Sequence, residues 1–244
     1  MKVSIITTSY NSSKTIEETI TSVQSQTYKN VEHIIVDGNS TDDTLKIIQK
    51  YPHLTSISEE DQGLYDAMNK GISMASGDMI AILNSDDLYA STEVIASVVK
   101  AFKENESDCI LTDIEIFNDQ SKKVIRTYSA RKWRMWMFRI GWQPPHPGFF
   151  AKSSVYKAHG NFDIQFKISA DFDFMFRVLY HKKTSYTKIH ETTVSMRAGG
   201  ISQSGFKSRA MANKEDHLSI KKYGYFSSPL LIWSKYLMKI LQYI

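Results

Sequence analysis

The chain has 244 residues, 42% of them hydrophobic and 12% aromatic, which supplies a packed core and excludes a disordered or low-complexity protein. Its net charge of +4 and pI of about 8.9 suit a phosphate-bearing ligand or an anionic membrane surface better than nucleic acid. The single cysteine, Cys109, excludes a disulfide framework. With no signal-peptide pattern and no run of about 18 apolar residues, we expect a cytoplasmic protein that is at most peripheral to the inner face of the membrane.

Strands and helices alternate through the first hundred residues. Short, β-branched apolar runs predict strands at 3–8, 31–37, 54–58 and 79–83. Apolar residues at helical spacing, with capping residues before them, predict helices that begin at residue 12 or 13 and that cover 41–51, 63–75 and 91–103. Because strands alternating with helices of about 10–15 residues indicate βαβ units, we expect a mainly parallel sheet with right-handed crossovers.

The pattern changes after about residue 108. Alternating residues predict strands at 109–117, 123–128, 184–189 and 193–197, and helices are expected at 170–181 and 206–222. The basic and aromatic segment 131–139 and the apolar tail 229–244 suit an interfacial surface on anionic lipid. A helix that packs on the domain or on a second subunit is the competing interpretation of the tail, so a homodimer is a further expectation.

Polar side chains follow three of the first four predicted strands, namely at 8–11, at Asp37 and at Asp86 and Asp87. In a parallel sheet these strand ends share one edge, where open α/β sheets bind ligands. Asp37 can accept hydrogen bonds from a base and Asp86 from ribose, while Asp87 can hold Mg²⁺ or Mn²⁺ across two phosphates. No glycine-rich dinucleotide or phosphate-loop motif is present, which argues against NAD and ATP. Taken alone, the adjacent acids are more typical of a solvated turn or a helix N-cap.

Five motifs in order make the chain resemble glycosyltransferase family 2, the inverting enzymes with a GT-A nucleotide-sugar fold. The motifs lie at residues 8–11, 24–28, 36–44, 61–71 and 83–87. The form Tyr-Asp-Ala-Met-Asn-Lys-Gly at 65–71 resembles the bacterial branch that builds exopolysaccharide, capsule and O-antigen units. The resemblance implies an α/β fold with a Rossmann-like, mainly parallel sheet, helices on both faces, and a smaller mixed sheet in the acceptor half.

The resemblance also implies roles for individual residues. It places a nucleotide against Thr8, Tyr10, Asn11, Asp37, Asp61, Lys70 and Asp86, and a Mn or Mg ion on Asp87. The general base is expected in 169–173, where Ala170 stands in place of the family's usual Glu. Asp171 matches the base, and Asp173 remains the alternative, although helical spacing turns it away from Asp171.

Two further residues have open roles. His146, in a proline-rich segment, is either a contact to metal, diphosphate or acceptor, or a structural hydrogen-bonding residue. Ser202 belongs to a loop that resembles the family's glycine-serine loop, which is either a flap over the donor or an ordinary surface connection.

The expected function is transfer of a hexosyl or N-acetylhexosaminyl group from a UDP-sugar to a glycan acceptor linked to undecaprenyl diphosphate. Residues 1–108 would bind the donor, residues 109–205 would bind the acceptor and carry catalysis, and residues 206–244 would form a helical, membrane-associated tail. Two other classes fit less well: a nucleotide-sugar-binding scaffold without activity, and a nucleic-acid binder suggested only by charge and the tryptophans at 133 and 136.

Overall fold

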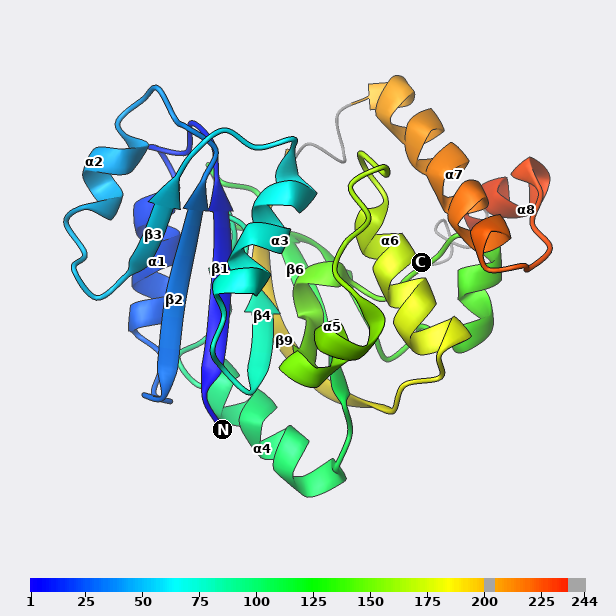
Figure 1. The fold of residues 1–244 in the computed structure, drawn as a ribbon, viewed down its shortest axis with the longest axis horizontal. Coiled ribbons are helices and arrows are strands. Elements are labelled where there is room, and N and C mark those ends of the chain that lie inside the picture. The colour runs from blue at the N-terminus through cyan, green and yellow to red at the C-terminus, as the bar shows by residue number, and fades with distance from the viewer. Residues whose placement is uncertain (200–204, 237–244) are drawn as a thin grey trace.

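The computed structural model describes residues 1–199 and 205–236, and a single sheet forms the centre of this part of the chain (Figure 1). Its strand order is β3-β2-β1-β4-β8-β6-β9-β5, with β7 paired to β6. The strands are β1 (Val3–Ser9), β2 (Val31–Asp37), β3 (Thr55–Ser58), β4 (Met79–Ile82), β5 (Leu88–Tyr89), β6 (Cys109–Phe117), β7 (Val124–Tyr128), β8 (Phe149–Lys152) and β9 (Tyr186–Arg197). The first four strands are mutually parallel, which confirms the prediction from their βαβ pattern.

The second half of the sheet differs from the sequence prediction in two ways. Strand β8, which was not predicted, runs antiparallel to both β4 and β6 and joins the mixed strands to the parallel ones, so they do not form a separate smaller sheet. The segment expected to form two strands is the single strand β9, parallel to β6. Its register shifts opposite Thr112, where residues 189–191 bulge out of the pairing, and this bulge explains the break in the sequence alternation.

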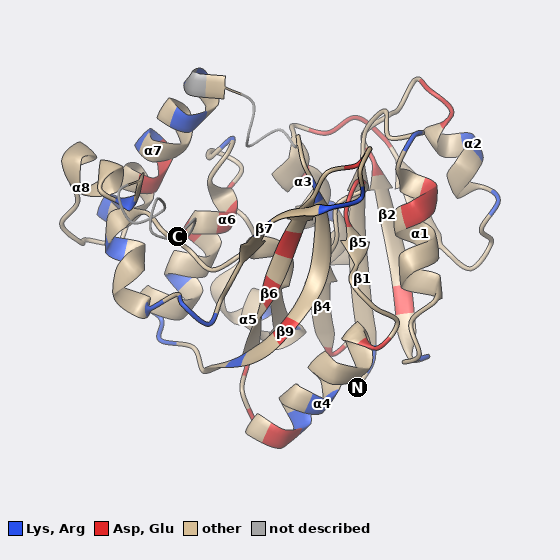
Figure 2. Cartoon of the chain, turned by 180° about the vertical axis from the view of Figure 1, so that it is seen from behind, with Lys and Arg blue, Asp and Glu red and all other residues tan. Residues whose placement is uncertain are grey.

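Helices cover both faces of the sheet. The α-helices are α1 (Ile16–Gln24), α2 (Thr44–Ile48), α3 (Leu64–Met74), α4 (Val94–Asn105), α5 (Ser153–His159), α6 (Ala170–Met175), α7 (Gly205–Lys222) and α8 (Pro229–Trp233). Helices α3, α5 and α6 lie on the face toward the viewer in Figure 1, and α1 and α4 lie on the opposite face (Figure 2). Successive strand residues point to opposite sides, so Ile6 and Ile80 pack with α3 and α6, whereas Ile5 and Ala81 pack with α1 and α4.

Helix α1 begins later than predicted, and α2 is shorter. Residues 12–15 form a turn in which the Ser12 carbonyl accepts from the Ile16 amide (3.0 Å), and the Ser12 and Ser13 amides donate to Thr44 Oγ1 (2.8 Å) and Asp42 Oδ2 (3.1 Å) in the loop after β2. The two loops therefore hold each other at the carboxyl edge of the sheet.

Two short 3₁₀ helices and a π-helical turn complete the second half of the chain. They are η1 (Met135–Ile140), η2 (His146–Gly148) and η3 (Phe176–His181), and η3 continues α6. Helix α7 packs on α6, and α8 packs on α7 and η1. No helix among the described residues is long and apolar enough to cross a membrane, and the predicted tail beyond residue 236 lies outside the described part.

Candidate active site

The carboxyl ends of β1, β2 and β4 lie side by side, as the sequence predicts. Strands β1 and β2 pair in register up to Ser9 opposite Asp37. Strand β4 lies on the other side of β1, and just beyond it the Leu83 amide donates to the Ile6 carbonyl (2.9 Å). The loops after these strands therefore form one edge, the position at which open α/β sheets bind ligands.

Asp37 lies beneath this edge and is 0% exposed. Its carboxylate accepts hydrogen bonds from the Ser9 hydroxyl (3.0 Å), the Ser40 amide (2.8 Å) and hydroxyl (2.5 Å), and the Ser58 hydroxyl (2.8 Å). These four donors occupy the acceptor positions that a carboxylate offers. The side chain fixes the loop after β2, and the predicted contact between Asp37 and a nucleotide base would require it to exchange some of these partners.

A cavity of about 260 Å³ opens at this loop and is lined by Tyr10, Gly38, Glu60 and Asp61. A Cβ at residue 38 would lie 2.5 Å from Asp61 Oδ2, so glycine leaves the room that this carboxylate occupies. The other oxygen of Asp61 accepts from the Gly63 amide (2.7 Å), which fixes the carboxylate. The open acceptor at this end of the crevice is therefore Asp61.

The residues after β1 are held against the loop after β2. Asn11 has a positive φ of 48°, its amide donates to Ser40 Oγ (2.8 Å), and its side-chain oxygen accepts from the Thr41 amide (2.9 Å). Thr8 is buried, and its hydroxyl has no hydrogen-bond partner among the described residues. Tyr10 and Asn11 are thus exposed at the crevice, whereas Thr8 lies below it.

Lys70, on α3, is held by acidic neighbours. Its ammonium lies 2.8 Å from Glu59 Oε1 and 3.6 Å from Asp66 Oδ2, and it donates to the Glu60 carbonyl (2.7 Å). The hydrogen bond to Glu59 raises the pKa of Lys70, so the charge is retained. The side chain ties the loop after β3 to α3, and a contact to a phosphate would require it to exchange these partners.

Asp86 and Asp87 lie at the carboxyl end of β4, and Asp87 is only 1% exposed. Burial and the neighbouring Asp86 raise the pKa of Asp87 to about 8, and burial also raises the pKa of Asp86. The side-chain NH₂ of Asn84 donates to Asp87 Oδ2 (3.1 Å). The side-chain oxygen of Asn84 is buried and accepts no hydrogen bond from the described residues. The two carboxylates, one buried and one half-buried, therefore repel each other and form a set of oxygen atoms that can hold a cation.

This set fits a hard divalent cation. Mg²⁺ and Mn²⁺ favour carboxylate and phosphate oxygens, and Mg²⁺ commonly takes one or two carboxylates and completes its shell with substrate phosphates and water. In the described part of the chain, no group of three or more His, Cys, Asp or Glu side chains could hold a metal ion. A cation at Asp87 would accordingly need further ligands from a bound diphosphate.

Arg197 supplies positive charge beside the acidic pair, and sequence reasoning did not single it out. At the end of β9, its amide faces Asp87 Oδ1 (3.4 Å) and its Nε donates to the Asp86 carbonyl (3.3 Å). Its guanidinium also pairs with Glu18 (3.0 Å) and with Asp119. The sequence shows only an arginine that ends a strand before a glycine pair. Its contact with Asp86 and Asp87 arises because β5, which follows these two acids, pairs with β9 in the sheet.

Asp171, the predicted general base, receives hydrogen bonds from three directions. Gln143 Nε2 donates to Oδ2 (2.6 Å), and the Phe172 amide donates to Oδ1 (2.9 Å). The Tyr65 hydroxyl lies 3.1 Å from the same Oδ1 and 2.6 Å from the Ile168 carbonyl oxygen. The carboxylate is half-buried, and it joins α3, α6 and the proline-rich segment. An oriented, accessible carboxylate of this kind can act as a general base.

Asp173 has a different environment from Asp171, although the two are only two residues apart. It is 0% exposed and accepts from Ser219 Oγ (2.9 Å) and the Tyr223 hydroxyl (3.1 Å), with Lys222 Nζ at 3.4 Å. These partners all lie at the end of α7 or just after it. The structure therefore assigns Asp173 to the contact between α6 and α7 and leaves Asp171 as the candidate base.

His146 and Ser202 complete the predicted set. The His146 ring packs edge-on against Phe162 with 5.7 Å between ring centres. Burial lowers the pKa of His146 and the nearby Asp171 opposes this, so the structure brings a largely neutral imidazole close to the candidate base. Ser202 and its predicted flap lie outside the described residues.

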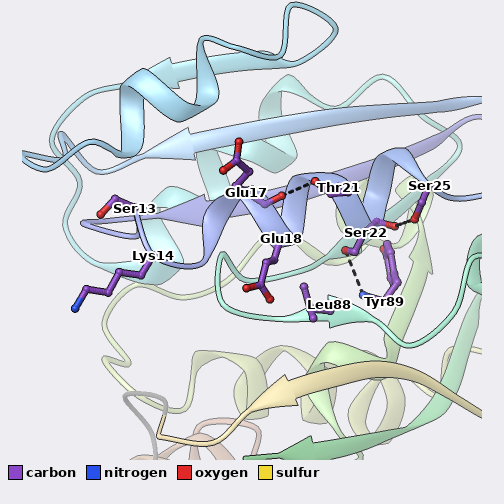
Figure 3. Close-up of a pocket in the computed structure, with 9 residues that line it drawn as sticks. All are labelled: Ser13, Lys14, Glu17, Glu18, Thr21, Ser22, Ser25, Leu88 and Tyr89. Carbon is purple, nitrogen blue, oxygen red and sulfur yellow. Dashed lines mark hydrogen bonds between the residues drawn. The ribbon is translucent and has the colours of Figure 1, made fainter. Parts of the chain in front are cut away.

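A second, open cavity of about 510 Å³ lies between α1 and β5 (Figure 3). It is lined by Ser13, Lys14, Glu17, Glu18, Thr21, Ser22, Ser25, Leu88 and Tyr89. The hydroxyls of Thr21, Ser22 and Ser25 already donate to carbonyls of their own helix, at 2.8 to 3.0 Å. The two carboxylates of the groove, Glu17 and Glu18, pair with Lys50 (3.5 Å) and Arg197 (3.0 Å), so they too already have partners within the protein.

Comparison with known proteins places this site in a family. The model of glycosyl transferase family 2 matches residues 4–163. A glycosyltransferase of Mycobacterium tuberculosis is 34% identical over 179 residues, which cover 72% of this chain and 68% of the relative. The Escherichia coli UDP-Glc:alpha-D-GlcNAc-diphosphoundecaprenol beta-1,3-glucosyltransferase WfaP is 43% identical over 95 residues, 38% of each chain.

Solved structures show the same fold at low sequence identity. S. aureus TarS in complex with UDP-GlcNAc superposes with a TM-score of 0.71 over 95% of this chain and 70% of that one, at 18% identity. The mannosyltransferase PcManGT from Pyrobaculum calidifontis, in complex with GDP-Man and Mn²⁺, gives 0.68 over 93% and 66%, at 17% identity. Fold and site thus define a glycosyltransferase of the GT-A type. With the family model matching 4–163, the chain belongs to glycosyltransferase family 2.

Proposed function

We propose that the protein transfers a sugar, with inversion at the anomeric carbon, from a UDP-sugar to a hydroxyl of a lipid-linked glycan in bacterial surface polysaccharide synthesis. One observation carries the proposal: the start of α3 joins the cavity at Asp61 to the candidate base, because Tyr65 lies within hydrogen-bond distance of Asp171 (3.1 Å). Donor recognition in residues 1–108 and acceptor activation in residues 109–205 would thereby be built around one helix.

The choice of substrates rests on relatives. The printed name of WfaP gives UDP-glucose as its donor and a GlcNAc-diphosphoundecaprenol as its acceptor. TarS was solved with UDP-GlcNAc, which makes a hexose and an N-acetylhexosamine the two sugars to test. Asp61 at the cavity would accept from the base N–H, and Asp86 would accept from ribose hydroxyls.

Asp171 would perform the chemistry at the acceptor. Its carboxylate takes the proton of the acceptor hydroxyl while that oxygen bonds to the anomeric carbon from the face opposite the diphosphate. The bond from the anomeric carbon to the phosphate oxygen breaks, and its electron pair leaves on the nucleoside diphosphate. Gln143 and Tyr65 hold the carboxylate in place for this step.

The leaving diphosphate requires positive charge. Asp87, with Asp86 and the Asn84 side-chain oxygen beside it, would hold Mn²⁺ or Mg²⁺, and this ion supplies charge neutralisation for the leaving group. Arg197 neutralises part of the negative charge of the acidic pair. Lys70 would add to the neutralisation only if it left Glu59 for a phosphate.

A donor screen followed by a transfer assay tests the proposal. We expect UDP, UDP-glucose or UDP-GlcNAc with Mn²⁺ to raise the melting temperature more than the GDP- and dTDP-sugars, because ligand binding stabilises the folded state. With a synthetic GlcNAc-diphosphate lipid as acceptor, the product should carry the inverted anomeric configuration. Binding without transfer to any glycan acceptor would favour a scaffold, and retention of configuration would exclude Asp171 as an inverting base.

Residues around α8 and η1 form the surface that we propose to contact the membrane. Four large apolar side chains are exposed there, Trp136, Phe226, Leu230 and Trp233. The elements belong together, because η1 packs on α8 and Arg139 donates to the Phe226 carbonyl (2.9 Å). Exposed basic residues at 131, 132 and 134 precede η1. Aromatic and basic side chains in one place suit the headgroup region of an anionic bilayer, where a lipid-linked acceptor would be found.

Vesicle binding tests this surface independently of transfer. The double substitution L230S and W233S should reduce co-sedimentation with phosphatidylglycerol vesicles at least fivefold, whereas V124S and I125S, at exposed apolar residues of β7, should not. Vesicles of phosphatidylcholine alone should bind the wild type weakly. A change from dimer to monomer in the double variant, with vesicle binding unchanged, would instead assign the surface to a second copy of the chain.

A further inference from the structure

Glu215, on α7, holds the backbone that leads into the candidate base. Its carboxylate accepts three consecutive amides, those of Lys167 (2.9 Å), Ile168 (2.9 Å) and Ser169 (2.8 Å). The side chain is only 5% exposed, so these hydrogen bonds are made away from water. A buried carboxylate with three charge-assisted hydrogen bonds is a strong anchor for a loop.

The anchored peptide is also the one that meets the candidate base. The Ser169 amide donates to Glu215 (2.8 Å), and the carbonyl of the same peptide group, that of Ile168, lies 2.6 Å from the Tyr65 hydroxyl. That hydroxyl in turn lies 3.1 Å from Asp171 Oδ1. One peptide group therefore connects the Glu215 carboxylate with Tyr65 and, through its hydroxyl, with Asp171.

The adjacent residue of α7 supports the other side of Asp171. Asp216 pairs with Lys235 (2.7 Å), and Lys235 also donates to the Gly141 carbonyl (3.2 Å). Two residues further along, Gln143 donates to Asp171. Glu215 thus fixes residues 167–169, and Asp216, through Lys235, fixes the segment that begins at Gly141. The Asp171 side chain is held between these two segments.

We infer that Glu215 is a positioning residue for transfer, and that α7 belongs to the catalytic site although no residue of it has a predicted role in chemistry. The inference rests on the proposed function, because it assumes that Asp171 acts as the base. Without the three anchoring hydrogen bonds, the Ile168 peptide and Tyr65 would no longer fix the direction of the Asp171 carboxylate. Small displacements of a catalytic group lower turnover far more than they lower substrate binding.

Steady-state kinetics of Glu215→Gln test the inference. The amide keeps the shape of the side chain but turns an NH₂ group toward backbone amides, so at least one anchor is lost. We expect kcat to fall at least tenfold, with KM for UDP-glucose or UDP-GlcNAc and the thermal shift with UDP both within twofold of the wild type. Glu215→Asp, which retains the charge, should recover part of kcat, and Lys214→Gln, at the exposed neighbour, should behave as the wild type.

Hydrogen exchange of residues 165–172 shows whether the anchor has been released, and we expect faster exchange in Glu215→Gln. Faster exchange with wild-type kcat would overturn the inference, since the contact would then be purely structural. Equal loss of kcat and of UDP binding would also overturn it, because a positioning role predicts a loss in kcat alone. A wild-type protein that binds UDP-sugars but transfers to no acceptor would refute the proposed function itself, and the inference with it.

Discussion

At the scale of single residues, two carboxylates in one helix turn have opposite surroundings. Asp171 is half-buried and held by Gln143 and Tyr65, whereas Asp173 is fully buried and tied to the end of α7. We expect Asp171→Asn to reduce transfer by about 10²- to 10⁴-fold, because it removes general base catalysis. Binding of UDP, measured by thermal shift, should stay within twofold of the wild type.

The matched substitution Asp173→Asn should affect stability instead. It replaces an acceptor of hydrogen bonds from Ser219 and Tyr223 and removes the charge that faces Lys222, so we expect a loss of about 1–3 kcal/mol in the free energy of unfolding. Denaturant unfolding measures this loss. If Asp173→Asn abolished transfer in a stable protein while Asp171→Asn did not, the two roles would have to be exchanged.

Gly38 offers a test of the Asp61 cavity. A Cβ at this position would lie 2.5 Å from Asp61 Oδ2, and the flexible carboxylate can move away from it. We therefore expect Gly38→Ala to weaken UDP binding by about three- to tenfold, the equivalent of roughly one hydrogen bond, with an almost unchanged melting temperature. Asp61→Asn should weaken binding in the same direction. Unchanged UDP affinity in both variants would argue against the cavity as the base site.

At the scale of elements, α3 is placed by its close contact with the sheet. A Cβ at Gly71 would lie 2.3 Å from Ile6 Cγ2 and 3.3 Å from Val36 Cγ2, both in strands beneath the helix. Because α3 carries Tyr65 and follows Asp61, its distance from the sheet sets the spacing between the cavity and the candidate base.

Gly71→Ala should consequently destabilise the protein. Alanine favours helix by about 1 kcal/mol relative to glycine, but overpacking against β1 costs about 1–3 kcal/mol and the helix must move outward. We expect a net decrease in the free energy of unfolding, together with reduced transfer. Ser73→Ala, at an exposed position of the same helix, is the control and should change stability by less than about 0.5 kcal/mol. A stabilised Gly71→Ala protein would contradict this tight packing.

At the scale of the whole molecule, the buried His33 of β2 makes folding depend on pH. Burial, together with the charge of His53, lowers the pKa of His33 to about 3, whereas an unfolded histidine titrates near 6.5. Between these values the unfolded chain binds the proton and the native protein does not, so stability falls as pH falls. From pH 7.5 to 5.0 this group should remove about 2 kcal/mol from the free energy of unfolding.

Urea unfolding at the two pH values measures this effect. The variant His33→Gln removes the titrating group, and its loss of stability between pH 7.5 and 5.0 should be smaller than that of the wild type by about 2 kcal/mol. The same pH dependence in both proteins would show that other groups cause it.

Much of the fold and part of the site follow from sequence alone. Strand periodicity, alternation of strands with helices and the polar ends of β1, β2 and β4 predict the parallel half of the sheet and the edge at which the crevice lies. The short β8 and the bulge in β9 were not predicted, because four residues carry little periodicity and a bulge breaks the alternation.

The sequence by itself determined the family, the parallel core and the acids at the strand ends, because these depend on residue type and local spacing. Only the tertiary structure decided which acids face the crevice. Asp37 is enclosed by hydroxyls from three segments, and Asp61 takes the open position beside Gly38. Arg197 and Glu215 gain their roles the same way, from partners distant in the chain. Burial and long-range hydrogen bonds exist only after packing, and no local pattern encodes them.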